Sequence, residues 1–342
     1  MRRARPSSAT PGRRDAPAPR SVRRLVWLGV ALAALAGIAV AVVLTTRRRG
    51  PARELTTLPS AVRCLAFAPD SRVLAAATWH DGSVRLLDPT GGDVVRTLAA
   101  RPEVHALAFS RDGRYLAAVD DTTPVSVWET ASGAPVALPA LGKAVGTAAA
   151  FAPDTDELAL GLADGQVLFL DVATGAVRRG ARHDALVRAV AYAPSGLFAS
   201  GDERGTVTLW EREPEAQRAR FAPRLGGVRA LAFSPDGGAL VVTGDGPMLR
   251  VFDTATGAAR HTLSGHAERV EAVGFARGGG TLASASADGT VRLWDPTTGR
   301  ATVVLTPGTA PLYSLAYAPS GVLLAAGDGS GRIYTWKLDP GR

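Results

Sequence analysis

The 342-residue chain is poor in residue types on which several protein classes depend. It contains no asparagine, so it has no N-glycosylation sequon. Its two lysines, Lys143 and Lys337, are followed by Ala144 and Leu338, which excludes a phosphate-binding loop of the form GxxxxGK(S/T). The single cysteine, Cys64, cannot form a disulfide within the chain. The cysteine content therefore gives no information about the redox compartment.

Charge is scarce over most of the chain and concentrated at its beginning. The formal net charge is +8, but residues 1–53 hold twelve arginines and one aspartate. Subtracting these from the 39 basic and 31 acidic residues leaves 27 and 30, a net charge of minus three for the rest. A DNA-binding domain carries its positive charge on the folded body, whereas here the charge lies in the tail and the body is near neutral. No nucleic-acid partner is therefore expected for the body. We interpret the bias towards Arg, Ala, Gly and Pro as the coding bias of a GC-rich, bacterial genome.

The beginning of the chain divides by composition into a tail and an apolar run. Residues 1–24 are rich in Arg and Pro without apolar periodicity, and we expect them to be disordered. Residues 25–45 carry no charge and are flanked by arginines. As a helix, 21 residues extend about 31 Å, which matches the hydrocarbon core of a bilayer. The sequence therefore predicts a single transmembrane helix, a signal anchor over 25–45, with a linker over 46–52.

Two alternatives to the anchor follow from the same residues. A buried core helix is disfavoured because so long an uncharged run has no polar face. A cleaved export signal is the stronger rival, because residues 22–27 loosely resemble a twin-arginine signal. Keeping the basic tail in the cytoplasm would leave the N-terminus inside and the body outside. We expect a single-pass membrane protein with that orientation.

Two sequence markers recur seven times through the rest of the chain. The first is an aromatic residue followed by a small residue and a turn, with steps of 42, 42, 41, 41, 42 and 42 residues. The second is a large apolar residue that ends an alternating strand, with steps of 40 to 42. The first marker occupies Phe67, Phe109, Phe151, Tyr192, Phe233, Phe275 and Tyr317, and the second occupies Leu87, Trp128, Leu170, Trp210, Phe252, Trp294 and Trp336.

Each repeating unit contains short β-rich runs separated by turn residues. In the sixth unit the runs are 270–276, 281–287, 290–295 and 301–305, divided by Gly-Gly-Gly, Asp-Gly and Thr-Thr-Gly. Four short strands in each of seven units predict a radial array of four-stranded sheets. The sequence therefore predicts an all-β, seven-bladed β-propeller over residues 53–342.

The sixth unit resembles the WD-repeat family. Its residues 288–295 read DGTVRLWD, preceded by Gly265 and His266, and the resemblance extends over about residues 53–338. It implies a blade-stabilising network of His266, Ser284, Asp288 and Trp294. The fourth unit keeps the His, Ser and Trp of this network but has Arg204 where the aspartate would lie; the three retained residues are His183, Ser200 and Trp210.

The first and last residues of the body predict how the ring closes. After Trp336 too few residues remain for the outer strand of the seventh blade. Residues 54–58 precede the first unit without a blade of their own, and they resemble the last strands of blades five and six. We therefore expect residues 54–58 to complete blade seven and to remove an exposed sheet edge.

The resemblance also indicates where a partner would bind. In this family the position four residues before the aromatic marker lies near the rim of the central channel. Arginine and tyrosine, which are enriched in binding hot spots, are frequent there. We therefore predict that proteins or peptides bind at the rim. The candidates at this position are Arg63, His105, Arg188, Arg229, Glu271 and Tyr313, and the neighbouring candidates are Arg269 and, in the turns before the third strands, His80, Asp121, Glu203 and Asp245.

Other reactive residue types have ordinary explanations. Cys64 occupies a position that is small in every unit, so a packed thiol is expected. The five histidines have no metal-ligand spacing, and neither a metal nor a cofactor is expected. The leading hypothesis is thus a non-catalytic, membrane-tethered scaffold or sensor. The alternative is a propeller enzyme, lactonase-like or quinone-cofactor dehydrogenase-like, which would need ligands converging on the channel axis.

Overall fold

The computed structural model describes residues 52–142, 145–211 and 217–338. The predicted tail (1–24), the predicted membrane span (25–45) and nearly all of the predicted linker (46–52) lie outside these ranges. Within them, no helix is long and apolar enough to cross a membrane. The anchor, its orientation and the export-signal alternative therefore stay predictions.

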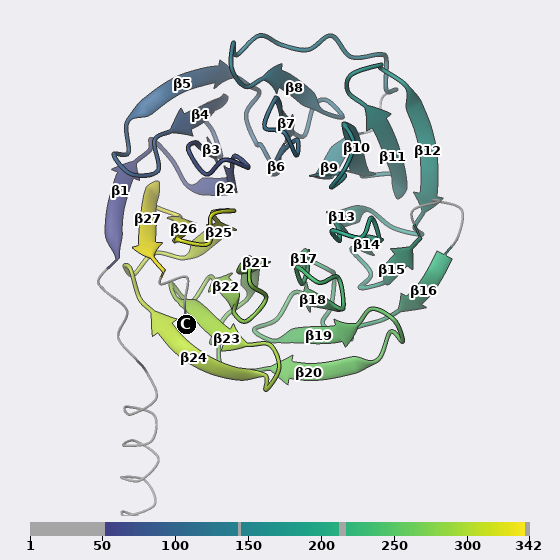
Figure 1. Ribbon diagram of the computed structural model, residues 1–342, viewed down its shortest axis with the longest axis vertical. Coiled ribbons are helices and arrows are strands. Elements are labelled where there is room, and N and C mark those ends of the chain that lie inside the picture. The colour runs from purple at the N-terminus through teal and green to yellow at the C-terminus, as the bar shows by residue number, and fades with distance from the viewer. Residues whose placement is uncertain (1–51, 143–144, 212–216, 339–342) are drawn as a thin grey trace, which may run out of the picture. The chain divides into compact units, whose positions relative to one another are not determined.

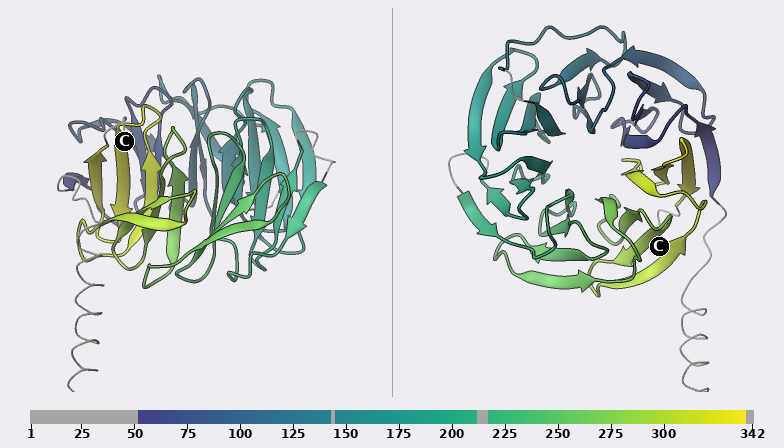
Figure 2. Two further views of the ribbon diagram at one scale, coloured as in Figure 1. Left: turned by 60° about the horizontal axis from the view of Figure 1, so that its bottom comes forward. Right: turned by 180° about the vertical axis from the view of Figure 1, so that it is seen from behind.

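The described chain forms seven sheets that stand radially around a common axis (Figure 1; Figure 2 shows the same ring from the side and from behind). Six sheets have four strands and one has three, and all neighbouring strands are antiparallel. The prediction of an all-β, seven-bladed propeller is confirmed. Each sheet is called a blade below and is numbered in chain order.

The first four blades follow one another along the chain, and the first strand of each lies nearest the axis in Figure 1. Their strands are β2 (Val62–Phe67), β3 (Leu74–Thr78), β4 (Ser83–Leu87) and β5 (Val94–Ala99) in blade 1; β6 (Ala106–Phe109), β7 (Tyr115–Val119) and β8 (Ser126–Glu129) in blade 2; β9 (Gly146–Phe151), β10 (Glu157–Leu162), β11 (Gln166–Asp171) and β12 (Val177–Arg182) in blade 3; β13 (Val187–Tyr192), β14 (Phe198–Asp202), β15 (Val207–Trp210) and β16 (Gln217–Phe221) in blade 4.

The last three blades include the strand that comes first in the sequence. Their strands are β17 (Ala230–Phe233), β18 (Ala239–Thr243), β19 (Leu249–Asp253) and β20 (Ala259–Leu263) in blade 5; β21 (Val270–Phe275), β22 (Leu282–Ser286), β23 (Val291–Asp295) and β24 (Arg300–Leu305) in blade 6; β25 (Leu312–Tyr317), β26 (Leu323–Asp328), β27 (Arg332–Lys337) and β1 (Arg53–Thr57) in blade 7.

The second strand of a blade is buried on both faces because a neighbouring blade covers each face. Every residue of β22, LASAS, is buried, and the same holds for β3, β7, β14 and β18. Small and branched apolar residues suit such a doubly covered strand. The apolar clusters extend across blade boundaries, since Leu209 of blade 4 and Leu240 of blade 5 belong to one cluster. Packing between blades therefore forms the core.

The first strand of the sequence closes the ring. β1 pairs with β27 in antiparallel register, with Arg53 opposite Thr335 and Thr57 opposite Arg332, as the adjacent purple and yellow strands of Figure 1 show. Beyond the strand, the backbone N–H of Leu58 donates to the carbonyl of Gly331 at 2.7 Å. The strand expected at 54–58 thus begins and ends one residue earlier.

Blade 2 departs from the expected four strands. It has three strands and only an isolated bridge between Trp128 and Pro135 where the outer strand would lie. The backbone N–H of Val136 still donates to Val127 at 2.8 Å. Proline has no N–H to donate, and Pro135 and Pro139 both fall in this segment, so a regular ladder cannot form.

Candidate functional site

The blade network of the sixth unit forms one chain of hydrogen bonds. Nε1 of Trp294 donates to Oγ of Ser284 at 2.8 Å, and Oγ lies 2.7 Å from Nε2 of His266. Nδ1 of His266 lies 2.8 Å from the Asp288 carboxylate. A carboxylate only accepts, so Nδ1 carries the proton and Nε2 accepts from Ser284. Every polar atom of this buried chain is paired, which joins the first loop, second strand and third strand of blade 6.

Burial and hydrogen bonding set the protonation of this network. Burial lowers the pKa of His266, and hydrogen bonding to Asp288 only partly offsets that effect. Burial alone would raise the pKa of Asp288, but hydrogen bonds from Thr290, the Ala267 N–H and His266 together lower it to about 2. The network therefore holds a neutral imidazole beside an ionised carboxylate at neutral pH.

Blade 4 has the same network with a carboxylate from a different position. Nε2 of His183 lies 2.7 Å from Ser200, and Trp210 donates to Ser200 at 2.9 Å. Nδ1 of His183 lies 3.0 Å from Asp202, the last residue of β14. The expectation that blade 4 lacks this carboxylate, which rests on comparing Arg204 with Asp288, is therefore wrong. The available signal is that Asp120, Asp202 and Asp328 occupy one equivalent position at the end of the second strand, four residues after the buried Leu116, Phe198 and Leu324.

The rim is the end of the ring where the first strand of each blade begins and the second strand ends. Three of the predicted rim side chains are paired there with a carboxylate of their own blade, which follows the second strand. The pairs are His105 with Asp121 at 2.6 Å, Arg188 with Glu203 at 2.6 Å, and Arg229 with Asp245 at 3.2 Å.

A further charge cluster joins blades 5 and 6 at the rim. Arg269 donates to Glu271 at 2.7 Å, and Arg229 approaches the same carboxylate at 3.9 Å. The Glu271 side chain is only 6% exposed, so the two arginines largely cover it. Each predicted rim side chain of blades 2, 4, 5 and 6 thus interacts with another side chain of the rim.

Blades 7 and 1 form a different part of the rim, which we call the aromatic sector: Arg63, Trp79, His80 and Tyr313. The Arg63 guanidinium carbon lies 4.3 Å from the Trp79 ring centre and 4.9 Å from that of Tyr313. None of the ion pairs found in the described ranges involves Arg63. The Trp79 and His80 rings meet edge to face at 5.9 Å. The sector therefore presents a cation between two aromatic rings, all partly exposed.

Trp79 is not among the residues predicted at the rim, although its position in the repeat carries a signal. Trp79 lies five residues after the buried Leu74 of its second strand. The rim carboxylates Asp121, Glu203 and Asp245 lie five residues after the equivalent buried residues Leu116, Phe198 and Leu240. In blade 7 this position is Gly329, where a Cβ atom would lie 3.1 Å from the Tyr313 ring. At this position blade 1 has the indole of Trp79 and blade 7 has a glycine, where other blades have a carboxylate. The Trp79 ring and the Tyr313 ring can therefore both approach Arg63.

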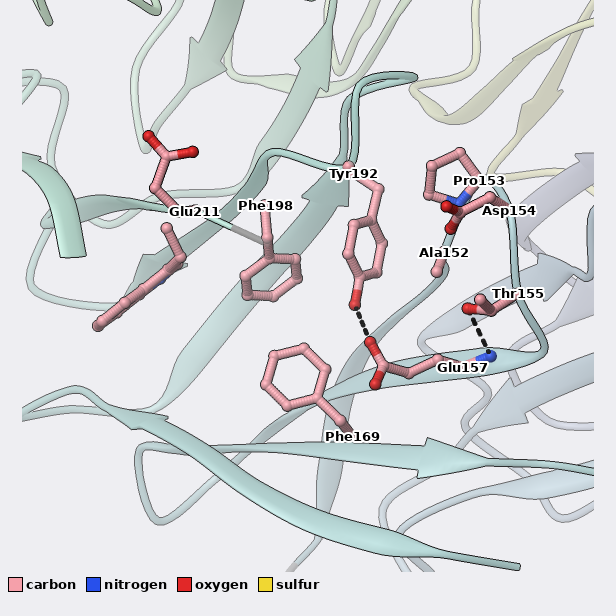
Figure 3. A pocket seen from close by; sticks show the side chains of 11 residues that line it. Ala152, Pro153, Asp154, Thr155, Glu157, Phe169, Tyr192, Phe198 and Glu211 are labelled. Atoms are coloured by element: carbon pink, nitrogen blue, oxygen red, sulfur yellow. Dashed lines mark hydrogen bonds between the residues drawn. The ribbon is translucent and has the colours of Figure 1, made fainter. Parts of the chain in front are cut away.

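A small pocket lies between blades 3 and 4 at the opposite end of the ring (Figure 3). Phe169, Tyr192 and Phe198 contribute rings, and the Tyr192 hydroxyl donates to Glu157 at 3.0 Å. The other Glu157 oxygen accepts from Arg178 at 2.8 Å. The cavity of about 30 Å³ holds a water-sized group and is far below the size of a small-molecule site. This pocket is best explained as a joint between blades.

The remaining reactive groups also have structural partners. The Cys64 thiol is buried and lies 3.5 Å from the Val104 carbonyl, and burial raises its pKa to about 12. In the three described ranges, no group of three or more His, Cys, Asp or Glu side chains is arranged to hold a metal ion. The lactonase-like or dehydrogenase-like alternative stays untested.

Comparison with known proteins identifies repeats in two places. The family described as WD domain, G-beta repeat (WD40), matches residues 52–88 and 257–295. Each match begins at or just before the outer strand of one blade, β1 or β20, and continues through three strands of the next. No curated protein matches the chain. The chain is therefore a seven-bladed β-propeller that carries WD40 repeats in two places.

Proposed function

We propose that this protein is a non-catalytic scaffold that binds a protein or peptide at the rim of its propeller, through the aromatic sector. A propeller with WD40 repeats fits an interaction role. The main observation behind this proposal is that Arg63 contacts the rings of Trp79 and Tyr313 and has no carboxylate partner in the described ranges. Trp, Tyr and Arg are the residue types that dominate binding hot spots.

The geometry favours a partner that combines an acceptor with an apolar group. The Arg63 guanidinium carbon lies over both aromatic rings, and in the described ranges no carboxylate pairs with its N–H groups, which can bind a carboxylate or a carbonyl of the partner. Trp79 and Tyr313 hold the side chain in place, which lowers the entropy lost on binding. The other rim cations would first have to leave their own carboxylates. Binding at the aromatic sector therefore costs less desolvation free energy than binding at the rim arginines that are paired with carboxylates.

Quantitative crosslinking in intact cells tests this role. We expect Arg63→Ala and Trp79→Ala each to reduce recovery of the crosslinked partner at least tenfold, because each removes one member of the stack. Arg114→Ala is the matched control, since this exposed arginine stacks on Tyr115 away from the rim. An unchanged partner set in both rim variants would contradict the proposal.

The scaffold is also proposed to be tethered to a membrane and to report there on a partner, with its N-terminus in the cytoplasm and the propeller outside. The support is the uncharged run 25–45 and the arginines around it, which lie outside the described residues. Carbonate extraction should leave the full chain in the membrane pellet and release a variant lacking 25–45. Protease added to intact cells should cleave a site introduced after residue 338. Release of the full chain by carbonate, or protection of that site, would refute the respective part.

A further inference from the structure

The end of the ring opposite the rim carries a second in-phase pattern. It lies where the first strand of each blade ends, two residues after the aromatic marker. Five blades have proline at this position and two have arginine, Arg111 in blade 2 and Arg277 in blade 6. The prolines are Pro69, Pro153, Pro194, Pro235 and Pro319.

Five of these seven positions line an open cavity of about 580 Å³. Both arginines line it, together with prolines of blades 1, 4 and 7, and Phe275 and Tyr317 add two aromatic rings. No carboxylate is among the lining residues in the described part of the chain. The volume falls in the range of small-molecule sites, and the lining combines apolar walls with two cations.

Three acidic side chains of the same turns form hydrogen bonds within their own turn. Asp70, Asp112 and Asp236 each accept a hydrogen bond from a backbone N–H of their own turn, at 2.9, 2.9 and 3.0 Å. Arg277 directs one N–H to the Pro319 carbonyl at 3.3 Å. Neither Arg111 nor Arg277 takes part in an ion pair found in the described ranges. The cavity thus holds two exposed cations without a counter-charge.

We propose that this cavity binds a small organic anion, whose phosphate or carboxylate group meets Arg111 or Arg277 and whose apolar part packs on Phe275 and Tyr317. Guanidinium groups bind both oxyanions through paired N–H donors. This site is independent of the partner-binding role proposed for the rim.

Isothermal titration of the purified full-length chain in detergent tests the proposal. The probes are phenyl phosphate and benzoate, which carry the two oxyanions on a ring, and benzyl alcohol, which carries no charge. We expect at least one anionic probe to bind at millimolar concentration or below, and benzyl alcohol to bind at least tenfold more weakly. Comparing the two anions distinguishes a phosphate ligand from a carboxylate ligand.

Two double variants assign the binding to the arginines. Arg111→Pro/Arg277→Pro gives both blades the residue found in the other five, so the fold should persist, as circular dichroism would show. We expect it to weaken binding at least tenfold, and Arg111→Lys/Arg277→Lys to weaken it less. Arg72→Ala, at an exposed arginine outside the cavity, should have no effect. Failure of both anions to bind, equal binding of benzyl alcohol, or undiminished binding in the proline variant would overturn the proposal.

Discussion

At the residue scale, one hydroxyl oxygen joins three elements of blade 6. Oγ of Ser284 accepts from Trp294 and donates to His266, and the Ser284 side chain is fully buried. Removing it leaves the indole N–H and the imidazole nitrogen without partners in the interior. An unsatisfied buried polar group costs about 1 to 3 kcal/mol.

We therefore predict that Ser284→Ala lowers the free energy of unfolding by about 2 kcal/mol. Urea denaturation of the purified variant and of the unmodified chain measures this difference in the free energy of unfolding. Ser83→Ala in blade 1 is the control, because in the described part of the chain the Ser83 hydroxyl is buried without a hydrogen-bond partner. Equal losses in the two variants would argue against a special role of the network.

The same network predicts a dependence of stability on pH. Burial holds the pKa of His266 below its ordinary value of 6.5, although Asp288 opposes this and Arg292 adds to it. Below about pH 6.5 the unfolded chain therefore binds a proton that the folded chain does not, so stability falls on acidification. The pKa of Asp288, lowered to about 2, adds a further loss as the pH falls from about 4 towards 2.

Urea denaturation at pH 7.5 and 5.5 checks the histidine contribution. We expect the free energy of unfolding of the unmodified chain to fall between these values, and that of His266→Gln to fall less, because glutamine does not titrate. If the free energy of unfolding changed between the two pH values by the same amount in both proteins, His266 would be excluded as a source of the pH dependence.

At the element scale, ring closure depends on the contact between β1 and β27. Gly331 has φ +92°, and a Cβ atom there would lie 2.2 Å from the Leu58 carbonyl oxygen. Its own carbonyl accepts the Leu58 N–H at the end of the closing pair. Glycine is therefore required both by its backbone conformation and by the approach of the first strand.

We predict that Gly331→Ala lowers the free energy of unfolding by about 2 to 4 kcal/mol and exposes β1 to proteolysis. Gly142→Ala is the matched control, since Gly142 has φ +90° with nothing within 4 Å of its Cβ position. The Gly142→Ala variant has the same backbone strain without a steric clash, so its free energy of unfolding should fall by less. Equal losses would show that the contact with Leu58 does not matter.

At the scale of the whole molecule, the ring could be predicted from the sequence and the state of the rim could not. The aromatic marker and the strand-end marker repeat once per blade, so their phase alone gives the number of blades. The pairing of Arg188 with Glu203, and the stacking of Arg63 between Trp79 and Tyr313, depend on side chains that meet between segments or between blades. Asp202 could not be predicted from the pattern of blade 6, because the carboxylate of blade 4 reaches its histidine from a different sequence position. Phase locates backbone positions but does not determine which side chains meet.

The central claim is that a partner contacts the rim at the aromatic sector of blades 7 and 1. A photoreactive amino acid placed at His80, and separately at Arg204 in the equivalent turn of blade 4, tests it directly, because both positions are exposed. After illumination of intact cells, we expect position 80 to give a defined crosslinked partner that is lost when Trp79→Ala is added, and position 204 to give little of it. Equal crosslinking from both positions, or crosslinking from position 204 alone, would contradict the account.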